Sequence, residues 1–260
     1  METKKSHPAL AFARARLRTV RVRDEDLQVW MAPDIDSLLT DFIEANQQNQ
    51  DLASQRCPFG AVLWPSARAL WEWLCEEPAR FEQVAGRIDD STFRVIELGC
   101  GVGFLSALLA ARTQWSITAS DYEPAYAEYL SANCKLYGSR MVDFQTLDWC
   151  EKAPQNILGR FDLVIACDVL YDDSHLESLP RIARELLKPE GALLLADPQR
   201  FRFETALEKI RTHFAKMNDY KIIVKNSDDD SLKSGVINPQ TQSTRVEILH
   251  CQNPFTSKST

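Results

Sequence analysis

The stretch from Val95 to Ser106 carries the residues whose types and spacing best suit ligand chemistry. An apolar run is followed by a carboxylate, by glycines at alternate positions and then by a helical pattern; these residues are Glu97, Gly99, Gly101 and Gly103. Glycine lets the backbone turn tightly or approach a ligand, and a helix start offers unpaired N–H groups and a positive dipole end. The stretch therefore predicts a strand turning into a helix that receives a polar, nucleoside-bearing cofactor.

A second acidic residue, Asp121, ends the next apolar run, Trp115 to Ser120. An acid about twenty residues beyond the glycines, at the tip of the second strand, is placed to accept hydrogen bonds from ribose hydroxyls. The two motifs together would serve a dinucleotide or S-adenosylmethionine alike. Taken alone, the glycines could also form a strand–turn–helix connection that binds no ligand.

Residues after two later strands complete the candidate set, because ligands of open α/β sheets lie outside the carboxyl ends of the strands. Asp148 and Trp149 follow the third predicted strand, where a carboxylate can accept from an adenine amino group and an indole can pack on the ring. A turn with a buried aromatic residue is the alternative for this pair. The stretch from Cys167 to Tyr171 follows the fourth strand, and its Asp168 could instead be a solvated helix cap.

These motifs resemble those of the seven-strand, class I S-adenosylmethionine methyltransferases. The Glu97-Leu98-Gly99 sequence and the G-x-G-x-G spacing match that family's first motif, where dinucleotide enzymes usually have G-x-G-x-x-G. Within the family, the chain is similar to protein-lysine enzymes that modify non-histone proteins, over residues 58 to 215. Three further stretches carry this likeness: Leu63–Ala67, Leu147–Trp149 and Asp168–Tyr171.

The resemblance implies S-adenosylmethionine as the cofactor and a role for Trp64 as an aromatic lid over it. From the residues alone, Trp64 is more readily explained as a packing residue in the loop before a helix. The residues that we expect to bind the cofactor are Trp64, Glu97, Gly99, Gly101, Gly103, Asp121, Asp148, Trp149 and Cys167. We expect no metal, because the cysteines and histidines show no metal-ligand spacing.

Asp168 and Tyr171 are the candidates for catalysis, since methyl transfer needs a lone pair held in line with the methyl group and little else. A carboxylate can hold an incoming ammonium by a charged hydrogen bond, and a tyrosine can orient the nitrogen with its hydroxyl or its face. A lysine must also lose a proton before it attacks, to solvent or in a desolvated site. Asp168 is therefore not assigned as the general base.

The substrate class follows from the same region of the sequence. Amino-methylating DNA and RNA enzymes of this fold typically carry Asn/Asp-Pro-Pro-Tyr/Phe after the fourth strand, and Asp168-Val169-Leu170-Tyr171 lacks those prolines. Asp197-Pro198-Gln199-Arg200 resembles the Asp-Pro-Gly-Arg stretch of the electron-transfer-flavoprotein β-subunit lysine methyltransferases, with Gln199 in place of the glycine. We therefore expect a lysine-bearing protein as the partner and no nucleic acid.

The alternation of strand and helix patterns from Phe93 onward predicts an α/β fold, a Rossmann-like, seven-stranded, mostly parallel sheet with helices on both faces. The expected strands are Arg94–Leu98, Ser116–Ser120, Val142–Leu147, Phe161–Cys167, Ala192–Ala196, Lys221–Val224 and Arg245–Leu249. The expected helices are Phe104–Ala111, Pro124–Tyr137, Leu176–Leu187 and Glu204–Phe214. This domain is expected to span residues 58–260.

Residues 1–57 are expected to form a small N-terminal extension of a β-hairpin and a helix. Thr19–Arg23 and Leu27–Met31 flank an acidic turn, and Asp36 is the expected cap of a helix through Ala45. A polar linker, Gln47 to Gln50, leads to a second helix that we expect Ser66 to cap. The arginine-rich start could instead be an organellar targeting segment.

Composition agrees with one acidic domain of 260 residues, of which 45% are hydrophobic. Residues 1–23 hold seven of the 30 Lys/Arg and one of the 37 Asp/Glu, so the remaining 23 basic and 36 acidic residues carry a formal charge of −13. Such a body repels phosphate backbones and attracts basic partners. Scattered cysteines and the lack of a long apolar run favour a cytoplasmic protein without a membrane segment, which we expect to be a monomer.

Three other functions are compatible with parts of the sequence. An NAD-dependent oxidoreductase would need a glycine one position later and a hydride-handling residue set, neither of which is found. A small-molecule amine methyltransferase would share the motifs and differ in how closed the substrate pocket is. A non-enzymatic S-adenosylmethionine-binding module would be expected to have lost the glycine loop or the ribose acid, and both are intact.

Overall fold

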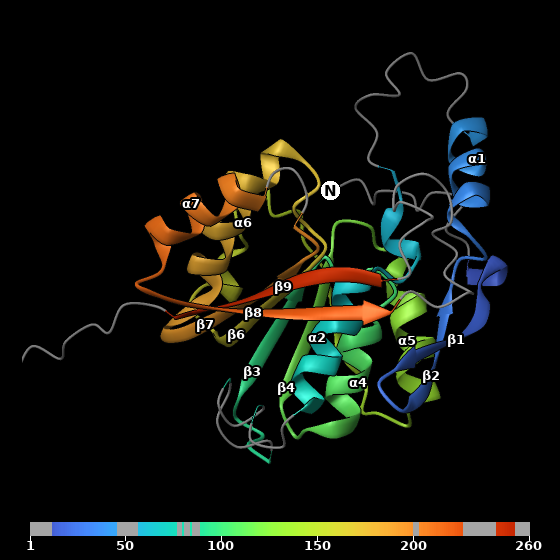
Figure 1. Cartoon of the computed structure of the whole chain (residues 1–260), viewed down its shortest axis with the longest axis horizontal. Coiled ribbons are helices and arrows are strands. Elements are labelled where there is room, and N and C mark those ends of the chain that lie inside the picture. The colour runs from blue at the N-terminus through green and yellow to red at the C-terminus, as the bar shows by residue number, and fades with distance from the viewer. Residues whose placement is uncertain are drawn as a thin grey trace, which may run out of the picture.

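A seven-stranded sheet runs through the centre of the protein in the computed structural model, which describes residues 12–45, 57–76, 80, 84, 89–199, 203–225 and 243–252 (Figure 1). Its strand order is β5-β4-β3-β6-β7-β9-β8, and β9 runs antiparallel to the other six strands. The strands are β3 (Arg94–Leu98), β4 (Ser116–Asp121), β5 (Asp143–Thr146), β6 (Phe161–Cys167), β7 (Leu187–Asp197), β8 (Lys216–Lys225) and β9 (Ser243–Gln252). The predicted mostly parallel, seven-stranded sheet is confirmed.

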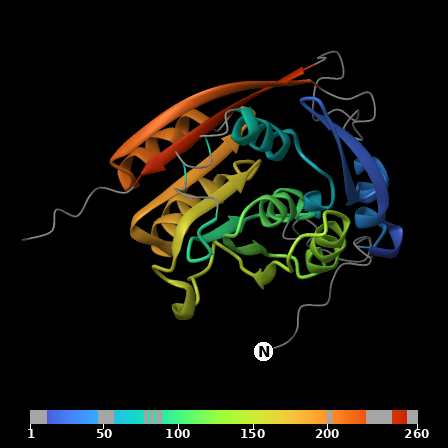
Figure 2. The same ribbon diagram turned by 90° about the horizontal axis from the view of Figure 1, so that it is seen from below.

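Helices cover both faces of this sheet (Figure 2). One face packs against α2 (Pro65–Glu76), α4 (Phe104–Arg112) and α5 (Tyr126–Leu136), and the other packs against α6 (Asp173–Leu186) and α7 (Phe203–His213). Alternate residues of the strands therefore enter two separate cores, as Val95 and Ile96 of β3 do. Strand order reverses between β3 and β6, so the ligand crevice of an open α/β sheet is expected at their carboxyl ends.

The last three strands are longer than the sequence predicts. β7 begins at Leu187, five residues before the predicted start at Ala192, because its pairing with β6 continues through an irregularity in register. β8 begins at Lys216, where lysine, asparagine and aspartate disfavour a strand locally. Pairing of Lys216 with Gln252 of β9 extends both strands despite those propensities.

The N-terminal extension consists of β1 (Arg16–Val22), β2 (Glu25–Met31) and α1 (Ile35–Ala45). Its apolar side chains, such as Val29, belong to the same core as α2, α4 and α5. Arginines of the hairpin bind main-chain carbonyls: Arg18 donates to Pro33 at 2.8 Å and Arg23 donates to Cys75 at 2.6 Å. Part of the basic charge of the N-terminal segment therefore stabilises the fold.

Both predicted helix caps in this half of the chain are wrong. Asp34, not Asp36, caps α1, because its carboxylate accepts from the Ser37 N–H at 2.6 Å. Ser66 lies inside α2, which begins at Pro65. Sequence spacing alone could not separate these neighbouring positions, since a cap depends on which residue leaves helical geometry first.

The expected Gln47–Gln50 linker lies outside the described residues, as do residues 226–242 and 253–260. Among the helices that the structure describes, none has the length and apolar character needed to cross a membrane.

Candidate active site at the carboxyl ends of the sheet

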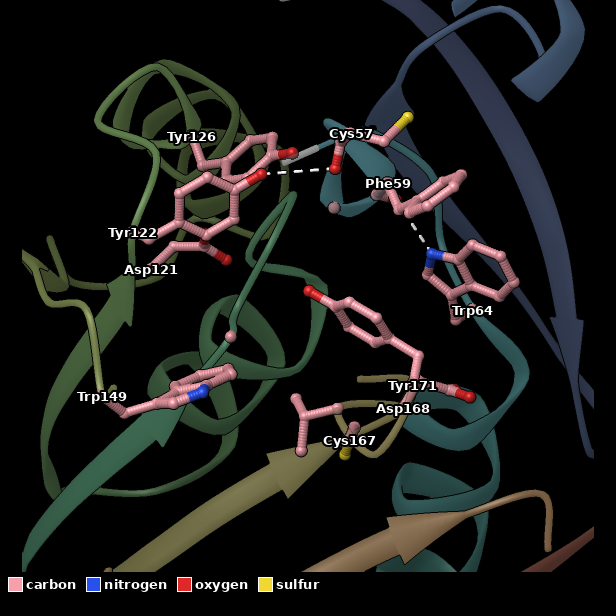
Figure 3. A pocket seen from close by; sticks show the side chains of 13 residues that line it. Cys57, Phe59, Trp64, Asp121, Tyr122, Tyr126, Trp149, Cys167, Asp168 and Tyr171 are labelled. Carbon is pink, nitrogen blue, oxygen red and sulfur yellow. Dashed lines mark hydrogen bonds between the residues drawn. The ribbon is translucent and has the colours of Figure 1, made fainter. Parts of the chain in front are cut away.

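A cavity of about 210 Å³ lies at the carboxyl ends of β3, β4 and β6. Seven residues expected from the sequence line it: Trp64, Gly99, Asp121, Trp149, Cys167, Asp168 and Tyr171. Residues 57–64, here called the strap, pass over the cavity. In Figure 3, Asp121 and Tyr122 lie on one side, Trp64 on the other, and the Tyr171 hydroxyl projects between them. The fold thus brings five of the nine residues predicted for the cofactor together with both residues predicted for transfer.

The glycine loop packs directly against the strap. Gly101 has a φ of +49°, and a Cβ on it would lie 2.4 Å from the carbonyl oxygen of Gly60. Gly101 and Glu97 line a second, smaller cavity of about 40 Å³, which shares several lining residues with the first. Gly103 is a lining residue of neither cavity, because it lies against Leu130 of α5. A Cβ on Gly99 would lie 2.8 Å from the ring of Trp149, so close packing within the chain explains all three glycines without any ligand.

Glu97 binds the start of α4 and does not line the larger cavity. Its carboxylate accepts from the backbone N–H of Ser106 at 3.1 Å and from the hydroxyl of the same residue. Burial raises the pKa of Glu97 to about 7, against the lowering effect of these hydrogen bonds. The side chain thus fixes the first turn of the helix whose N–H groups follow the glycine loop.

Asp121 lies where the sequence predicts, at the tip of β4 and on the wall of the large cavity. It accepts from the Gly101 N–H at 3.0 Å, which ties the second strand end to the glycine loop. Burial raises the pKa of Asp121 to about 7. A carboxylate so placed can accept hydrogen bonds from a bound diol once it is ionised.

Of the neighbouring residues Asp148 and Trp149, only Trp149 lines one of the two cavities. Trp149 is almost completely buried and lines the large cavity, as expected. Asp148 lines neither cavity described above, and its carboxylate accepts from the Cys150 N–H at 3.0 Å in a local turn. The predicted contact of Asp148 with adenine therefore stays a prediction, and its observed hydrogen bond is that of a turn residue.

Asp168 caps the N-terminus of α2 from inside the cavity wall. Its Oδ2 accepts from the Ser66 N–H at 2.7 Å, a contact between residues 102 positions apart. Its φ of +58° is unusual for a residue other than glycine and turns the chain sharply after β6. Asp168 is thus a helix cap, but a buried one of a distant helix, and it also lines the cavity.

Tyr171 is the most exposed of the expected site residues, with 42% of its surface accessible. Its ring lies edge-on to Phe59 of the strap, with centroids 6.5 Å apart. The ring therefore stands between the cavity and the surface, and its hydroxyl points inward (Figure 3).

The Asp197–Arg200 stretch follows β7 and lines neither cavity with its described residues. Asp197 is fully buried, and the amide of Gln199 donates to Glu247 of β9. Gln199 has a φ of +56°, a conformation that favours glycine. The family that the chain resembles has glycine at this position. The positive φ seen here gives a physical reason for that glycine.

Sequence reasoning missed six lining residues: Cys57, Phe59, Gly60, Tyr122, Tyr126 and Val169. Tyr122 directly follows Asp121 and could have been found from that position. Cys57, Phe59 and Gly60 of the strap gave no such signal, because their place over the cavity depends on distant contacts. One of these is the hydrogen bond at 3.3 Å from the Tyr122 hydroxyl to the Cys57 carbonyl.

The lining residues fit an adenosine-bearing cofactor. The Tyr126 hydroxyl and the Trp149 Nε1 are buried donors with no hydrogen-bond partner among the described residues, and both residues line the cavity. Burying such a donor unpaired costs about 1–3 kcal/mol, so a ligand with acceptor atoms would stabilise the site. Aromatic rings beside Asp121 suit a flat base joined to a ribose. Sheet order, glycine loop and Asp121 together define a class I methyltransferase.

Comparison with known proteins identifies the family. A family model described as lysine methyltransferase matches residues 42–219, and the chain belongs to this family. It is therefore an S-adenosylmethionine-dependent methyltransferase, as the sequence motifs predict. The chain is 30% identical over 169 residues to protein N-lysine methyltransferase METTL21A of Danio rerio, covering 62% of this chain and 71% of that protein.

Two other relatives carry more specific names. The chain is 27% identical over 192 residues to the electron transfer flavoprotein beta subunit lysine methyltransferase of Xenopus laevis, covering 71% of this chain and 70% of that protein. It is 28% identical over 197 residues to the calmodulin-lysine N-methyltransferase of Arabidopsis thaliana, covering 73% of this chain and 59% of that protein. The match to this last enzyme thus spans little more than half of its length.

Solved structures support the fold alone. A precorrin-6y C5,15-methyltransferase from Geobacter metallireducens aligns with a TM-score of 0.51 at 17% identity, covering 69% of this chain and 88% of that one. The [4+2]-cyclase SpnF aligns with the same TM-score of 0.51 at 16% identity, covering 75% of this chain and 85% of that one.

Proposed function

We propose that this protein transfers a methyl group from S-adenosylmethionine to the side-chain amine of a lysine on a partner protein. The observation that carries the proposal is that one cavity is lined both by Asp121 and Trp149 and by Asp168 and Tyr171. A methyl donor and an amine acceptor must meet in line, so the residues that hold each must share one space.

Asp121 and the aromatic walls would hold the donor. The ionised Asp121 carboxylate accepts from the ribose hydroxyls, and Trp149 and Tyr122 present ring surface on the same cavity for the adenine. Glu97 acts on the donor through α4, whose first turn it fixes by bonding Ser106. Trp64 is held over the cavity by its Nε1, which donates to the Phe59 carbonyl at 2.9 Å. This geometry supports the lid role that the family resemblance implies.

Asp168 and Tyr171 would hold the acceptor. When bound, S-adenosylmethionine supplies an electrophilic methyl group on a positively charged sulfur. The lysine ammonium would first lose a proton to solvent, and the neutral amine would then accept that methyl group, leaving S-adenosylhomocysteine. The Asp168 carboxylate attracts the ammonium, and the partly exposed Tyr171 ring orients the nitrogen. Positioning is thus the main contribution of the protein.

The partner is proposed to be a protein with a basic surface around its target lysine. The −13 charge of the chain beyond residue 23 favours such a partner, and a nucleic acid is disfavoured for the same reason. The names of the relatives point to protein-lysine substrates for those proteins. A monomer acting in the cytoplasm is part of this proposal, and it rests on the seven free cysteines and the acidic surface charge.

Incubation with radiolabelled S-adenosylmethionine and a cell extract tests the proposal. We expect label in protein, and mass spectrometry of the labelled product should show methyl mass increments on a lysine. Asp121→Ala is the matched control, since losing a charge-assisted ribose contact should cost about 1.5–3 kcal/mol of cofactor binding. Label in small amines would support the small-molecule alternative, and cofactor binding without any transfer would support a binding module.

A further inference from the structure

We infer that His175 is a positioning residue of the transfer site, which fixes the ring of Tyr171 relative to Trp149. His175 lies in the first turn of α6 and lines neither cavity. It stands directly behind the cavity wall, where it contacts three residues that do line it. The inference rests in part on the proposed function, because Tyr171 is there assigned to the acceptor amine.

The imidazole lies between the two aromatic walls of the cavity. Its centroid is 4.8 Å from that of Tyr171 and 5.2 Å from that of Trp149. Both interplanar angles are 81°, the edge-to-face arrangement that aromatic rings favour. One buried ring thus joins the wall expected to face the donor to the tyrosine expected to face the acceptor.

The imidazole itself is held rigidly. His175 is 3% exposed, and its Nδ1 lies 2.7 Å from the carbonyl oxygen of Val169. A carbonyl only accepts, so Nδ1 carries the hydrogen and the ring orientation is defined. The helix turn below it is also fixed, because Asp172 accepts from the Ser174 N–H at 2.8 Å. His175 therefore offers Tyr171 a stationary surface.

Tyr171 needs such a surface more than the other lining residues do. It is 42% exposed and lies on the connection between β6 and α6, so packing holds less of its side chain. A misplacement of about 1 Å in a transfer site can cost on the order of 10²-fold in rate. Loss of the imidazole should therefore slow transfer, while the donor contacts of Asp121 stay in place.

Fluorotyrosine NMR tests this without any knowledge of the acceptor. The chain has six tyrosines, so incorporation of 3-fluorotyrosine gives a small set of ¹⁹F signals, and Tyr171→Phe identifies the signal of Tyr171. We expect His175→Ala to shift or broaden that signal and His175→Phe, which restores a ring, to return it toward its original position. His175→Leu replaces His175→Ala if the smaller side chain prevents folding. Leu179→Ala, in the same helix but in the core beneath it, controls for lost stability.

Cofactor binding and turnover complete the experiment. With His175→Ala we expect the dissociation constant of S-adenosylhomocysteine to stay within about threefold and labelling of extract protein to fall about tenfold or more. His175→Phe should recover most of the labelling, and Leu179→Ala should label normally. An unchanged Tyr171 signal in His175→Ala, or no rescue by phenylalanine, would overturn the inference. If wild-type protein labels no protein at all, the proposed function fails, and the NMR signals still decide the role of His175.

Discussion

At the scale of single residues, Asp121 is buried and also lines the cavity in which we propose that the cofactor binds. Burial raises its pKa to about 7, and only the ionised carboxylate can accept from both hydroxyls of a ribose. We therefore expect the affinity for S-adenosylhomocysteine to fall as pH drops below 7, by about tenfold between pH 8 and pH 6. Calorimetry across this range measures the effect.

Two variants separate Asp121 from its neighbour in this titration. Asp121→Asn should bind weakly with little dependence on pH, because the titrating group is gone. Glu97 has a pKa near 7 for the same reason of burial, but it bonds Ser106 and lines only the smaller cavity. Glu97→Gln should therefore keep most of the pH dependence. The same slope in Asp121→Asn as in the wild type would assign the titration elsewhere.

A pair of substitutions can separate the observed capping role of Asp168 from its proposed role in transfer. Asparagine at this position can still accept from the Ser66 N–H and tolerates the positive φ, but it lacks the negative charge. Asp168→Asn should keep nearly all of the stability while lowering turnover strongly. Asp168→Ala should lower turnover and also reduce the free energy of unfolding by about 1–2 kcal/mol, because the cap of α2 is lost.

Urea unfolding and label transfer, measured on both variants, check this prediction. Cofactor affinity should stay within several-fold of the wild type in Asp168→Asn. Near-normal turnover in that variant would mean that the carboxylate serves α2 and contributes no charge to transfer.

At the scale of elements, the contact between strap and glycine loop can be tested by adding one methyl group. Gly101→Ala should displace the strap, because its Cβ would lie 2.4 Å from the Gly60 carbonyl oxygen. Gly138→Ala is the matched control: its φ of +59° imposes a similar backbone cost, but a Cβ there meets nothing within 4 Å. We expect the control to lose about 1–2 kcal/mol of stability.

Gly101→Ala should lose about 1–3 kcal/mol beyond that control, because overpacking is added to the backbone cost. It should also weaken binding of S-adenosylhomocysteine by more than tenfold, since the strap and the loop both border the cavity. Urea unfolding and calorimetry measure the two effects. Equal losses of stability and equal affinities in the two variants would show that the strap does not depend on this glycine.

Local sequence patterns predicted the elements better than the contacts between them. Strand β6 matches its expected bounds, Phe161–Cys167, because a run of apolar residues marks it. The hydrogen bond from Ser66 to Asp168 could not be predicted, since it depends on how α2 meets the end of β6 across 102 residues. Of the strap, Trp64 was expected at the site, but Cys57, Phe59 and Gly60 were missed for the same reason. His175 was missed because it acts behind the cavity wall rather than in it.

At the scale of the whole molecule, the uneven charge has a structural basis. Arginines of the N-terminal hairpin bind carbonyls of the chain itself, as Arg18 and Arg23 do, so part of the basic charge serves the fold. The rest of the chain carries a formal charge of −13. Long-range attraction between such a body and a basic partner raises the association rate, and salt screens it over about 10 Å at 0.1 M.

We therefore expect methylation of a lysine peptide flanked by arginines to slow by about tenfold in kcat/KM between 20 and 300 mM salt. A peptide with the same lysine flanked by glutamates should react poorly at low salt. Lowering the salt concentration should raise its kcat/KM little or not at all. Binding of S-adenosylhomocysteine should change less than twofold over the range, because its contacts with Asp121 lie in a buried, unscreened site. Equal rates for both peptides at every salt concentration would remove the electrostatic argument for a basic protein partner and favour an acceptor recognised within the cavity alone.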